Sequence, residues 1–309
     1  MADFKGTREA FAQGIIDLAK ENERIMFVSP DSLKAMRATR FAELYPDQYV
    51  ETGIAEQAAV DAAAGLAAAG CIPFVGTYAG FLTMRACEQM RTFVAYPNLN
   101  VKFVGINSGL LGGEREGVTH QFYEDVGILS NIPNFTIFTP ADGPQTYQAV
   151  KAAAEIDGPV YIRAGSGREA DLYGKEDAFS MDGIRIWREY GDEALLLSSG
   201  FVLDRVLKAA ELLKEQGIGV TVGDINIMYP KDPSKVIEAV KKAKRIVTVE
   251  DHNVNGGMGA YISKLVVEND PKPVKRIGLT SFGESGPAAE LADYYGFSPE
   301  NIAQTVRRM

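Results

Sequence analysis

The residues whose types and spacing could best support catalysis or ligand binding lie between 49 and 91. This segment reads YVETGIAEQAAVDAAAGLAAAGCIPFVGTYAGFLTMRACEQMR. Its pattern predicts the end of a strand, a turn at Gly53 and a helix that opens near Glu56. Strand-to-helix turns at the carboxyl edge of a parallel sheet are where such folds place ligands. A carboxylate in the first turn of a helix is also stabilised by the helix dipole. These residues therefore leave two interpretations open, a ligand site near 53–56 or a tightly packed helix.

The chain contains two histidines, His120 and His252, and two cysteines, Cys71 and Cys87. A histidine can act as an acid or base near neutral pH, but a lone loop histidine is more often solvated or structural. The cysteines form neither a C-x-x-C pair nor a dense framework, which favours a reducing compartment and gives no sign of a structural metal.

Short apolar runs alternate with amphipathic helical stretches along the whole chain. The predicted strands of the first half are 24–29, 71–78, 101–107, 135–140 and 159–165, and the helices between them are 7–22, 56–70 and 143–156. Strands that are almost entirely apolar indicate a parallel sheet covered by helices on both faces.

A polar, strand-poor stretch at 166–183 interrupts this rhythm, which then restarts at 194–199. We therefore expect two doubly wound, mostly parallel α/β domains, at 1–170 and 184–309, with a linker at about 171–183. The second contains a G-G-x-G sequence after His252, which lacks the full dinucleotide-binding spacing and is interpreted as a structural turn.

The composition indicates a soluble globular protein, with 309 residues of which 46% are hydrophobic and 24% charged. A net charge of -9 argues against nucleic-acid binding. The sequence has neither a secretory signal nor an apolar run long enough to span a bilayer, so we expect a cytoplasmic protein.

Three motifs of the first segment together carry a family resemblance. G-I-A-E-Q before a small-residue helix, then T-Y-x-x-F-L and R-A-x-E-Q, resembles the pyrimidine-binding domain of transketolases, and 1-deoxyxylulose-phosphate synthases share this order of motifs. The resemblance extends from Arg8 to the FGESG turn at 282–286 and begins where the second half of a full-length transketolase would. It implies a pyrimidine-binding domain followed by a transketolase C-terminal domain.

The resemblance assigns thiamine diphosphate as the cofactor and Glu56 as its activating residue. In that family the glutamate hydrogen-bonds a ring nitrogen of the aminopyrimidine, which favours the imino tautomer and makes the exocyclic nitrogen basic. Burial would raise the pKa of such a carboxyl and suit it to holding the shared proton. The protein tunes the cofactor, and the cofactor supplies the carbanion chemistry.

Further cofactor contacts are implied for Tyr78, Phe81 and Asp31. Tyr78 and Phe81 fall where the family stacks aromatic side chains on the aminopyrimidine, with core packing as the alternative for each. Asp31, in the sequence VSPDS, resembles an aspartate near the cofactor, although the residues around it depart from the family pattern.

Substrate contacts are implied by a glycine-rich loop that ends in G-x-T-H-Q at 117–121, followed by E-D at 124–125 and P-A-D at 140–142. The resemblance gives His120 a catalytic, substrate-facing role, in which it hydrogen-bonds the carbonyl and hydroxyl oxygens of the donor sugar. Arg8 and Arg163 match arginines that contribute to binding the substrate's phosphate, a task suited to the planar guanidinium.

Two positions depart from the family at the substrate side. Glu116 stands where an aspartate normally recognises the donor, and Asn107 stands where a phosphate-side histidine is usual, with Arg115 nearby as a possible substitute. These changes leave the identity of the sugar open.

The sequence lacks the G-D-G motif with a following asparagine that holds the divalent metal in thiamine diphosphate enzymes. The resemblance therefore implies a split transketolase, a transferase in which a separate N-terminal subunit carries the diphosphate and the Mg²⁺ or Ca²⁺, assembled as a heterotetramer. It would move a two-carbon ketol unit between a ketose donor and an aldose acceptor, either of which can be a phosphate.

Two alternatives remain at this point. One is the beta subunit of the first component of a 2-oxo-acid dehydrogenase, which shares the domain pair and also lacks the metal site. The other is a non-catalytic subunit that keeps the fold.

Overall fold

The computed structural model describes residues 4, 6–110, 112, 116–167 and 169–309. The chain divides into two compact units. The first is formed by the residues up to Ser108 together with Ile128–Phe179, and the second by Gly109–Gly127 together with Ser180–Met309. The segment from 109 to 127 thus belongs to the second unit although the chain on either side of it belongs to the first.

The first unit is built on a parallel sheet with the strand order β5-β6-β4-β3-β1-β2. Four of these strands are almost completely buried, which explains why they appear in the sequence as continuous apolar runs. The strands are β1 (Ile25–Ser29), β2 (Tyr49–Glu51), β3 (Ile72–Tyr78), β4 (Lys102–Ile106), β5 (Thr136–Phe138) and β6 (Val160–Arg163).

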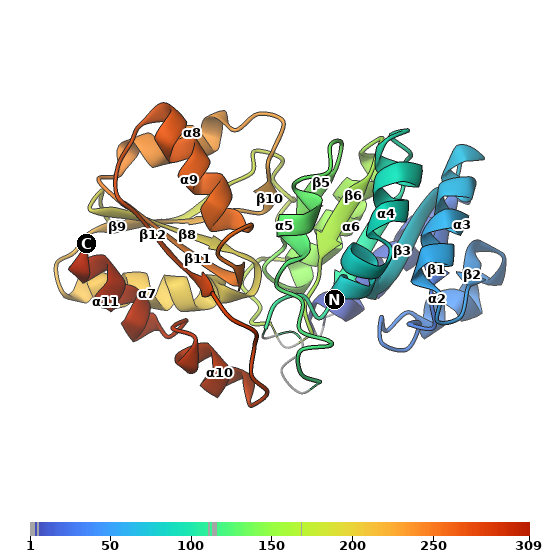
Figure 1. The fold of residues 1–309 in the computed structure, drawn as a ribbon, viewed down its shortest axis with the longest axis horizontal. Coiled ribbons are helices and arrows are strands. Elements are labelled where there is room, and N and C mark those ends of the chain that lie inside the picture. Colours follow the sequence, from blue (N-terminus) through green and yellow to red (C-terminus); the bar gives the residue numbers. More distant parts are fainter. Residues whose placement is uncertain (1–3, 5, 111, 113–115, 168) are drawn as a thin grey trace. The chain divides into compact units, whose positions relative to one another are not determined.

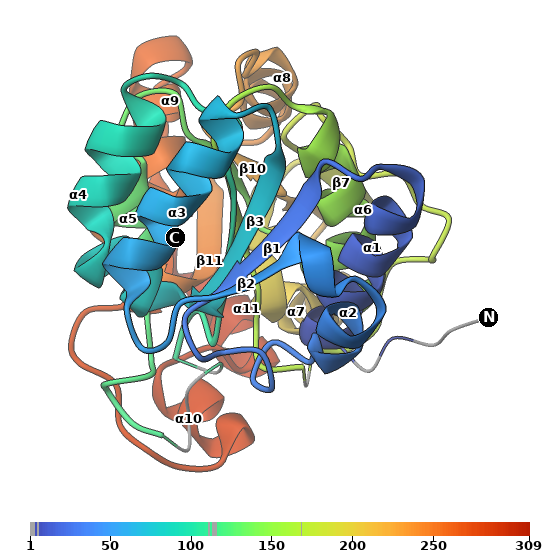
Figure 2. The same ribbon diagram turned by 90° about the vertical axis from the view of Figure 1, so that its right-hand side faces the viewer.

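Helices cover both faces of this sheet. Figure 2 shows α3 (Glu56–Ala68) and α4 (Cys87–Gln89) on one face and α1 (Thr7–Glu21) and α6 (Gly143–Glu155) on the other. Helices α1 and α6 approach closely, because a Cβ added at Gly14 would lie 2.9 Å from Val150 Cγ1. The remaining short helices of this part of the chain are α2 (Thr39–Leu44), η1 (Pro46–Gln48) and α5 (Asp125–Leu129), the last lying where the chain returns to the first unit.

The segment that follows β3 is not a regular α-helix. It consists of a π-helical turn η2 (Phe81–Arg85), the short α4, and a second π-helical stretch η3 (Met90–Ala95). The π-helix is rare in proteins and is found mostly as single turns at functional sites. Its position directly after a central strand makes this edge of the sheet a candidate for a functional site.

A buried lysine lies at the opposite edge of this sheet, where the parallel strands begin. Lys102 is fully buried at the start of β4, and its Nζ donates to the carbonyl oxygens of Ile156 at 2.6 Å and Gly158 at 2.7 Å. Burial lowers the pKa of Lys102 to about 7. The side chain satisfies carbonyl groups that the end of α6 leaves without helical partners.

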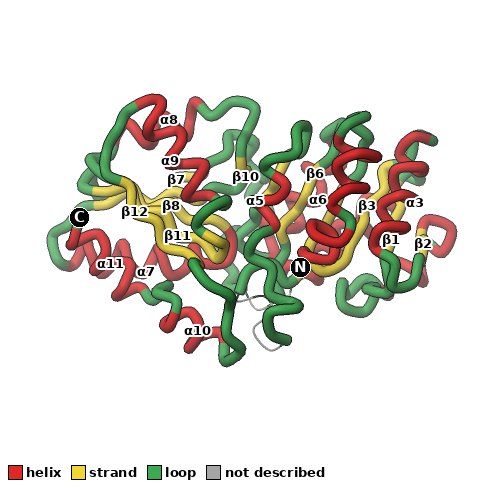
Figure 3. Tube along the Cα trace, viewed as in Figure 1, coloured by secondary structure: helices red, strands yellow, loops and turns green. Residues whose placement is uncertain are grey.

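The second unit has a five-stranded sheet with the order β12-β11-β8-β9-β7, in which only β7 runs antiparallel. Helices α7 and α11 lie on one face and α8 and α9 on the other (Figure 1; Figure 3 shows the same strands and helices by type). The bounds are β7 (Arg185–Glu189), β8 (Ala194–Ser199), η4 (Gly200–Val202), α7 (Leu203–Glu215), β9 (Val220–Asp224), β10 (Ile227–Met228), α8 (Ser234–Lys242), β11 (Ile246–Asn253), α9 (Met258–Asn269), β12 (Val274–Leu279), α10 (Ala288–Tyr294) and α11 (Pro299–Arg308). The predicted fold class, two mostly parallel α/β sheets, is confirmed.

The stretch before β7, expected as a linker at about 171–183, is packed over much of its length. The Asp142 carboxylate accepts hydrogen bonds from the backbone N–H groups of Leu172 and Tyr173, both at 2.7 Å. The ring of Phe179 lies 4.5 Å from that of Phe138 on β5. The chain therefore stays in the first unit as far as Phe179.

Candidate functional site

Glu56 stands at the carboxyl edge of the first sheet because a tight turn joins β2 directly to α3. Gly53 makes this turn with a φ of 68°, in the left-handed region that favours glycine, and α3 begins at Glu56 itself. The preceding residue, Ala55, has no side-chain oxygen to cap the helix. The Glu56 carboxylate is thus the acidic group at this helix N-terminus, and only 6% of the residue is exposed.

Three side chains, from the end of β3 and the turn that follows it, are linked in sequence to this carboxylate. Arg85 Nη1 is 2.8 Å from Glu56 Oε1 and its guanidinium carbon is 3.9 Å from the centroid of the Phe81 ring. The Phe81 ring in turn lies 5.2 Å from that of Tyr78, at an interplanar angle of 57°. The π-helical turn places Phe81 and Arg85 so that one guanidinium contacts both the ring and the carboxylate. Glu56, Tyr78, Phe81 and Arg85 therefore form one cluster, here called the Glu56 cluster.

The chemistry of the Glu56 cluster suits a flat, nitrogen-containing ring. A carboxylate oxygen binds a ring N–H or shares a proton with a ring nitrogen, and an aromatic side chain offers a π-face for stacking. Within the described part of the chain, Oε1 is the oxygen of Glu56 that takes the ion pair with Arg85. The residues predicted to bind an aminopyrimidine are thus neighbours in space, and their carboxylate and aromatic groups agree with that ligand.

A second carboxylate fixes the backbone on which the Glu56 cluster is built. Glu51 Oε1 accepts the backbone N–H of Asp31 at 2.7 Å and that of Gly53 at 2.8 Å, and Oε2 accepts the Tyr49 hydroxyl at 2.5 Å. Burial alone would raise the pKa of Glu51, but these hydrogen bonds from Tyr49, Asp31 and Gly53 bring it below its ordinary value. The loop after β1, with the predicted cofactor contact Asp31, is thereby tied to the turn before α3.

Asp31 itself is exposed and has a φ of 52°. A left-handed backbone is uncommon for residues other than glycine, although aspartate and asparagine tolerate it best. The carboxylate of Glu51 holds Asp31 through its backbone N–H.

Arg8 and Asn107 form a second group at the same edge of the first sheet. Arg8 donates from Nε to Gly165 O at 3.4 Å, from Nη1 to Ala35 O at 3.5 Å, and from Nη2 to the Asn107 side-chain oxygen. Asn107 is completely buried directly after β4, and within the described residues its Nδ2 has no hydrogen-bond partner. Since the arginine can only donate, it fixes which end of the Asn107 amide is the oxygen. Arg163, the last residue of β6, is 2% exposed.

The remaining predicted residues lie in the second unit, on the segment 109–127. Glu116 is exposed, and His120 is partly buried with its Nδ1 2.9 Å from the Thr119 hydroxyl. Arg115, considered as a substitute for a phosphate-side histidine, lies outside the described residues. The predicted site residues thus occur as the Glu56 cluster and the Arg8–Asn107 pair in the first unit, and as the His120 segment in the second.

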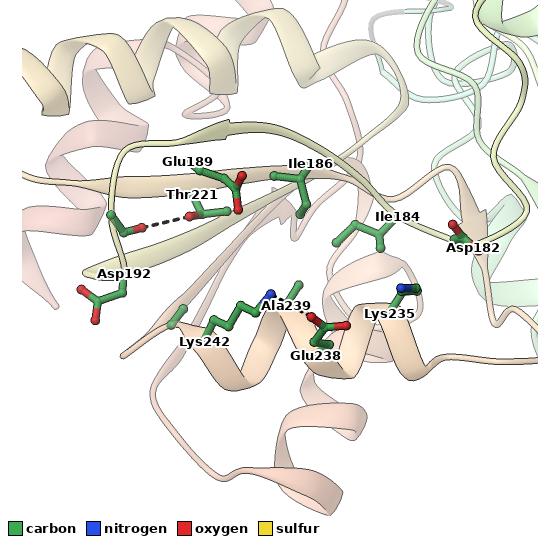
Figure 4. A pocket seen from close by; sticks show the side chains of 12 residues that line it. Asp182, Ile184, Ile186, Glu189, Asp192, Thr221, Lys235, Glu238, Ala239 and Lys242 are labelled. Carbon is green, nitrogen blue, oxygen red and sulfur yellow. Dashed lines mark hydrogen bonds and ion pairs between the residues drawn. The ribbon is translucent and has the colours of Figure 1, made fainter.

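A separate cavity of about 600 Å³ in the second unit contains none of the predicted site residues. It lies between strands β7 and β9 and helix α8, with Ile184 and Ile186 beside charged groups such as Glu189 (Figure 4). Lys242 on its rim is paired with Glu238 at 2.8 Å.

The described residues contain no group of three or more histidine, cysteine, aspartate or glutamate side chains arranged to hold a metal ion. In the same part of the chain, no helix is both long enough and apolar enough to cross a membrane.

Comparison with known families shows the protein family to which this chain belongs. Residues 5–167 match the pyrimidine-binding domain of transketolase, and residues 183–302 match the transketolase C-terminal domain. The chain belongs to the transketolase family. Membership implies thiamine diphosphate as the cofactor.

The relatives of this transketolase-family chain include proteins that it matches over nearly their whole length. It is 34% identical to a transketolase C-terminal section of Methanocaldococcus jannaschii, over 98% of this chain and 96% of that protein. It is 33% identical to a 6-deoxy-6-sulfo-D-fructose transketolase subunit of Clostridium sp. strain MSTE9, over 98% and 94%. Among solved structures, a split gene transketolase described as an inactive beta4 tetramer superposes with a TM-score of 0.88 at 32% identity, over 98% of this chain and 97% of that one. The resemblance seen in the sequence is confirmed, and these relatives do not favour the 2-oxo-acid dehydrogenase alternative.

Sequence reasoning missed Arg85 as a member of the Glu56 cluster. The residue was visible only as the first letter of the R-A-x-E-Q motif, and its distance of 29 positions from Glu56 carries no pairing signal. The π-helical turn was also missed, since i→i+5 hydrogen bonding has no distinct periodic pattern over five residues.

Proposed function

We propose that this chain is the pyrimidine-binding, C-terminal subunit of a thiamine diphosphate-dependent split transketolase. The enzyme would be a transferase that moves a two-carbon ketol unit from a ketose or ketose phosphate to an aldose or aldose phosphate. The observation that carries this proposal is the buried Glu56 carboxylate, linked through Arg85 to the Phe81 ring, in a chain with both transketolase domain matches.

In the first unit, Glu56 is assigned the catalytic role. Its carboxyl would share a proton with a ring nitrogen of the aminopyrimidine, which makes the cofactor's exocyclic nitrogen a base. Phe81 and Tyr78 would supply aromatic faces for the same ring, and Asp31 would contact the cofactor from the loop after β1. When bound, thiamine diphosphate supplies the carbanion chemistry, and the chain supplies orientation and proton placement.

The substrate contacts are assigned to His120, Glu116, Arg8 and Arg163. The His120 imidazole would hydrogen-bond the donor's oxygens and move a proton during cleavage of the carbon–carbon bond. The guanidinium groups of Arg8 and Arg163 would provide positive charge for an anionic sugar terminus. Asn107, held by Arg8, replaces a cationic group with a neutral amide donor. That difference, and a relative that acts on a sulfonated sugar, leave room for a donor other than the common sugar phosphates.

The proposal includes a second type of subunit. An N-terminal transketolase subunit would bind the diphosphate through Mg²⁺ or Ca²⁺, and two copies of each chain would form a heterotetramer. Support comes from relatives that the chain matches over nearly their whole length and that are described as transketolase sections and subunits. We assign the pyrimidine-binding domain to 1–170 and the C-terminal domain to 184–309, with residues 171–183 between them, in a cytoplasmic enzyme.

The test is reconstitution with the partner subunit, followed by an assay of ketol transfer between sugar phosphates. Glu56→Gln keeps the size of the side chain but cannot hold the shared proton, so turnover should fall by roughly 100-fold or more. Co-elution of the two subunits in gel filtration should not change. Full activity of Glu56→Gln would remove the catalytic assignment. Tight, metal-dependent binding of thiamine diphosphate by this chain alone would contradict the split arrangement.

A further inference from the structure

The segment that carries His120 is folded onto the second unit rather than the first. Its two ends are joined to each other, because Gly109 N donates to Phe122 O at 2.6 Å. The G-x-T-H-Q sequence therefore lies on a closed loop, and the contacts of that loop within the second unit decide where His120 is held.

Before His120, the loop is fixed by Asp251 at the carboxyl end of β11. Leu110 N donates to Asp251 Oδ1 at 2.8 Å, and Leu110 is completely buried. Gly109 packs so tightly against the same carboxylate that an added Cβ would lie 2.2 Å from Asp251 Oδ2, and its φ is 81°. Asp251 thus holds the part of the loop that precedes His120 by a buried hydrogen bond to its backbone.

After His120, the loop is fixed by β11 and by the turn that follows β12. Asn253 N donates to Tyr123 O at 2.7 Å, and Gly283 N donates to the Tyr123 hydroxyl at 2.9 Å. Gln121, the residue next to His120, donates from Nε2 to Glu284 O at 2.8 Å. Both Gln121 and Tyr123 are 1% exposed, so the two side chains that make these contacts are buried.

His252 completes the set of contacts where the loop ends. Its Nδ1 is 2.8 Å from Asn253 O, which can only accept, and its Nε2 accepts the backbone N–H of Gly127 at 3.4 Å. The Asn253 carbonyl therefore places a proton on Nδ1. Asp125 Oδ1 lies 3.6 Å from Nε2.

We infer that the E-D-H-N end of β11 is a positioning device for the substrate-facing loop, with Asp251 as its principal residue. This gives the C-terminal domain a part in the reaction. It holds His120 in place through the loop residues that precede and follow it, and Asp251 acts as a positioning residue. The inference rests on the proposed function for the role of His120, but the hydrogen bonds themselves make a claim that can be tested without turnover.

The first test is hydrogen–deuterium exchange of the chain alone. Asp251→Ala removes the acceptor for Leu110 N and should raise the exchange rate across residues 116–123 by about tenfold or more, with no change across 56–85. Asp251→Asn keeps an acceptor oxygen and should restore most of the protection. Asp204→Ala, which removes the partner of Lys208 on α7, is the matched control and should leave both regions unchanged.

The second test uses the complex reconstituted with the partner subunit. For Asp251→Ala, kcat/KM for the donor should fall by roughly 10- to 100-fold while the Kd of thiamine diphosphate stays within about twofold, because misplacement of a catalytic group affects transfer and not cofactor binding. Tyr123→Phe removes only the acceptor for Gly283 N and should give a smaller loss of the same kind. It keeps the test valid if Asp251→Ala does not fold.

The outcomes separate the two proposals. If the wild-type complex shows no ketol transfer but Asp251→Ala still loosens the loop, the proposed function fails and the positioning contact stands. If exchange and kcat/KM are both unchanged in Asp251→Ala and Tyr123→Phe, the inference is wrong. It is also wrong if thiamine diphosphate affinity falls as much as kcat/KM, because the effect would then be a general loss of structure.

Discussion

Replacing Arg85 with alanine is expected to strengthen the binding of thiamine diphosphate. The Arg85 guanidinium contacts the Glu56 carboxylate at 2.8 Å and lies over the Phe81 ring at 3.9 Å. These are the two groups proposed to bind the aminopyrimidine, so the cofactor has to compete with Arg85 for them. Removing the guanidinium abolishes that competition.

The magnitude follows from the two contacts that would be lost. The Arg85 side chain is 52% exposed, and an ion pair of that exposure contributes about 0.5 kcal/mol. The cation–π contact at a partly exposed site contributes about 0.5–1 kcal/mol. Together they amount to about 1–1.5 kcal/mol, which corresponds to an affinity gain of up to about tenfold.

The assay is a titration of the assembled complex with thiamine diphosphate at fixed Mg²⁺ concentration. Arg91→Ala is the matched control, because Arg91 is an exposed arginine of the same segment whose Nη1 contacts the adjacent Thr92 hydroxyl instead of Glu56. Arg85→Lys keeps the charge without the planar guanidinium and should lie between wild type and Arg85→Ala. Weaker binding by Arg85→Ala than by Arg91→Ala would refute the reasoning, since Arg85 would then support the carboxylate and not compete for it.

Two further expectations concern stability. Gly53→Ala should destabilise the chain by about 1–2 kcal/mol, since Gly53 has a φ of 68° and nothing within 4 Å of an added Cβ, so backbone strain alone acts. Gly65 in α3 also has nothing within 4 Å of an added Cβ, but its backbone is helical. Gly65→Ala should therefore stabilise the chain by up to about 1 kcal/mol. Equal shifts of Tm for Gly53→Ala and Gly65→Ala would contradict these two expectations. For Lys102, the pKa of about 7 in the folded chain against an ordinary 10.5 means that between these values the unfolded chain binds more protons, so stability rises with pH. The stability of wild type relative to Lys102→Met should therefore increase from pH 7 towards pH 10 with a slope of up to about 1.4 kcal/mol per pH unit, and a difference that is constant with pH would be evidence against a neutral buried lysine.

The sequence was sufficient for the features that local pattern and motif determine. The apolar strands, the alternation with helices and the helix opening at Glu56 all follow from periodicity and turn residues, and the structure has them. That Glu56, Tyr78 and Phe81 lie at one edge also follows, because β2 and β3 run parallel on either side of β1 and their carboxyl ends point the same way. The roles assigned to these side chains, and to Asp31, His120, Glu116, Arg8 and Arg163, stay predictions.

Contacts between distant parts of the chain could not be predicted in this way. Leu110 binds Asp251 across 141 positions, and nothing in either local sequence indicates the partner. For the same reason His252, interpreted as part of a structural turn, could not be connected with the loop that carries His120. The membership of 109–127 in the second unit depends on such hydrogen bonds, so a boundary drawn from composition alone places this segment with its neighbours in sequence.

The π-helical turn Phe81–Arg85 contains one residue more than an α-helical turn would need. Such a turn has the structure expected of a single-residue insertion that the surrounding helix has absorbed. Deleting Thr83 would remove the extra residue and bring Phe81 and Arg85 from four positions apart to three. Arg85 would then lose the spacing with which its guanidinium now reaches both the Phe81 ring and the Glu56 carboxylate. A change of one codon in length, and not of residue type, is therefore enough to change how the cation meets the Glu56 carboxylate.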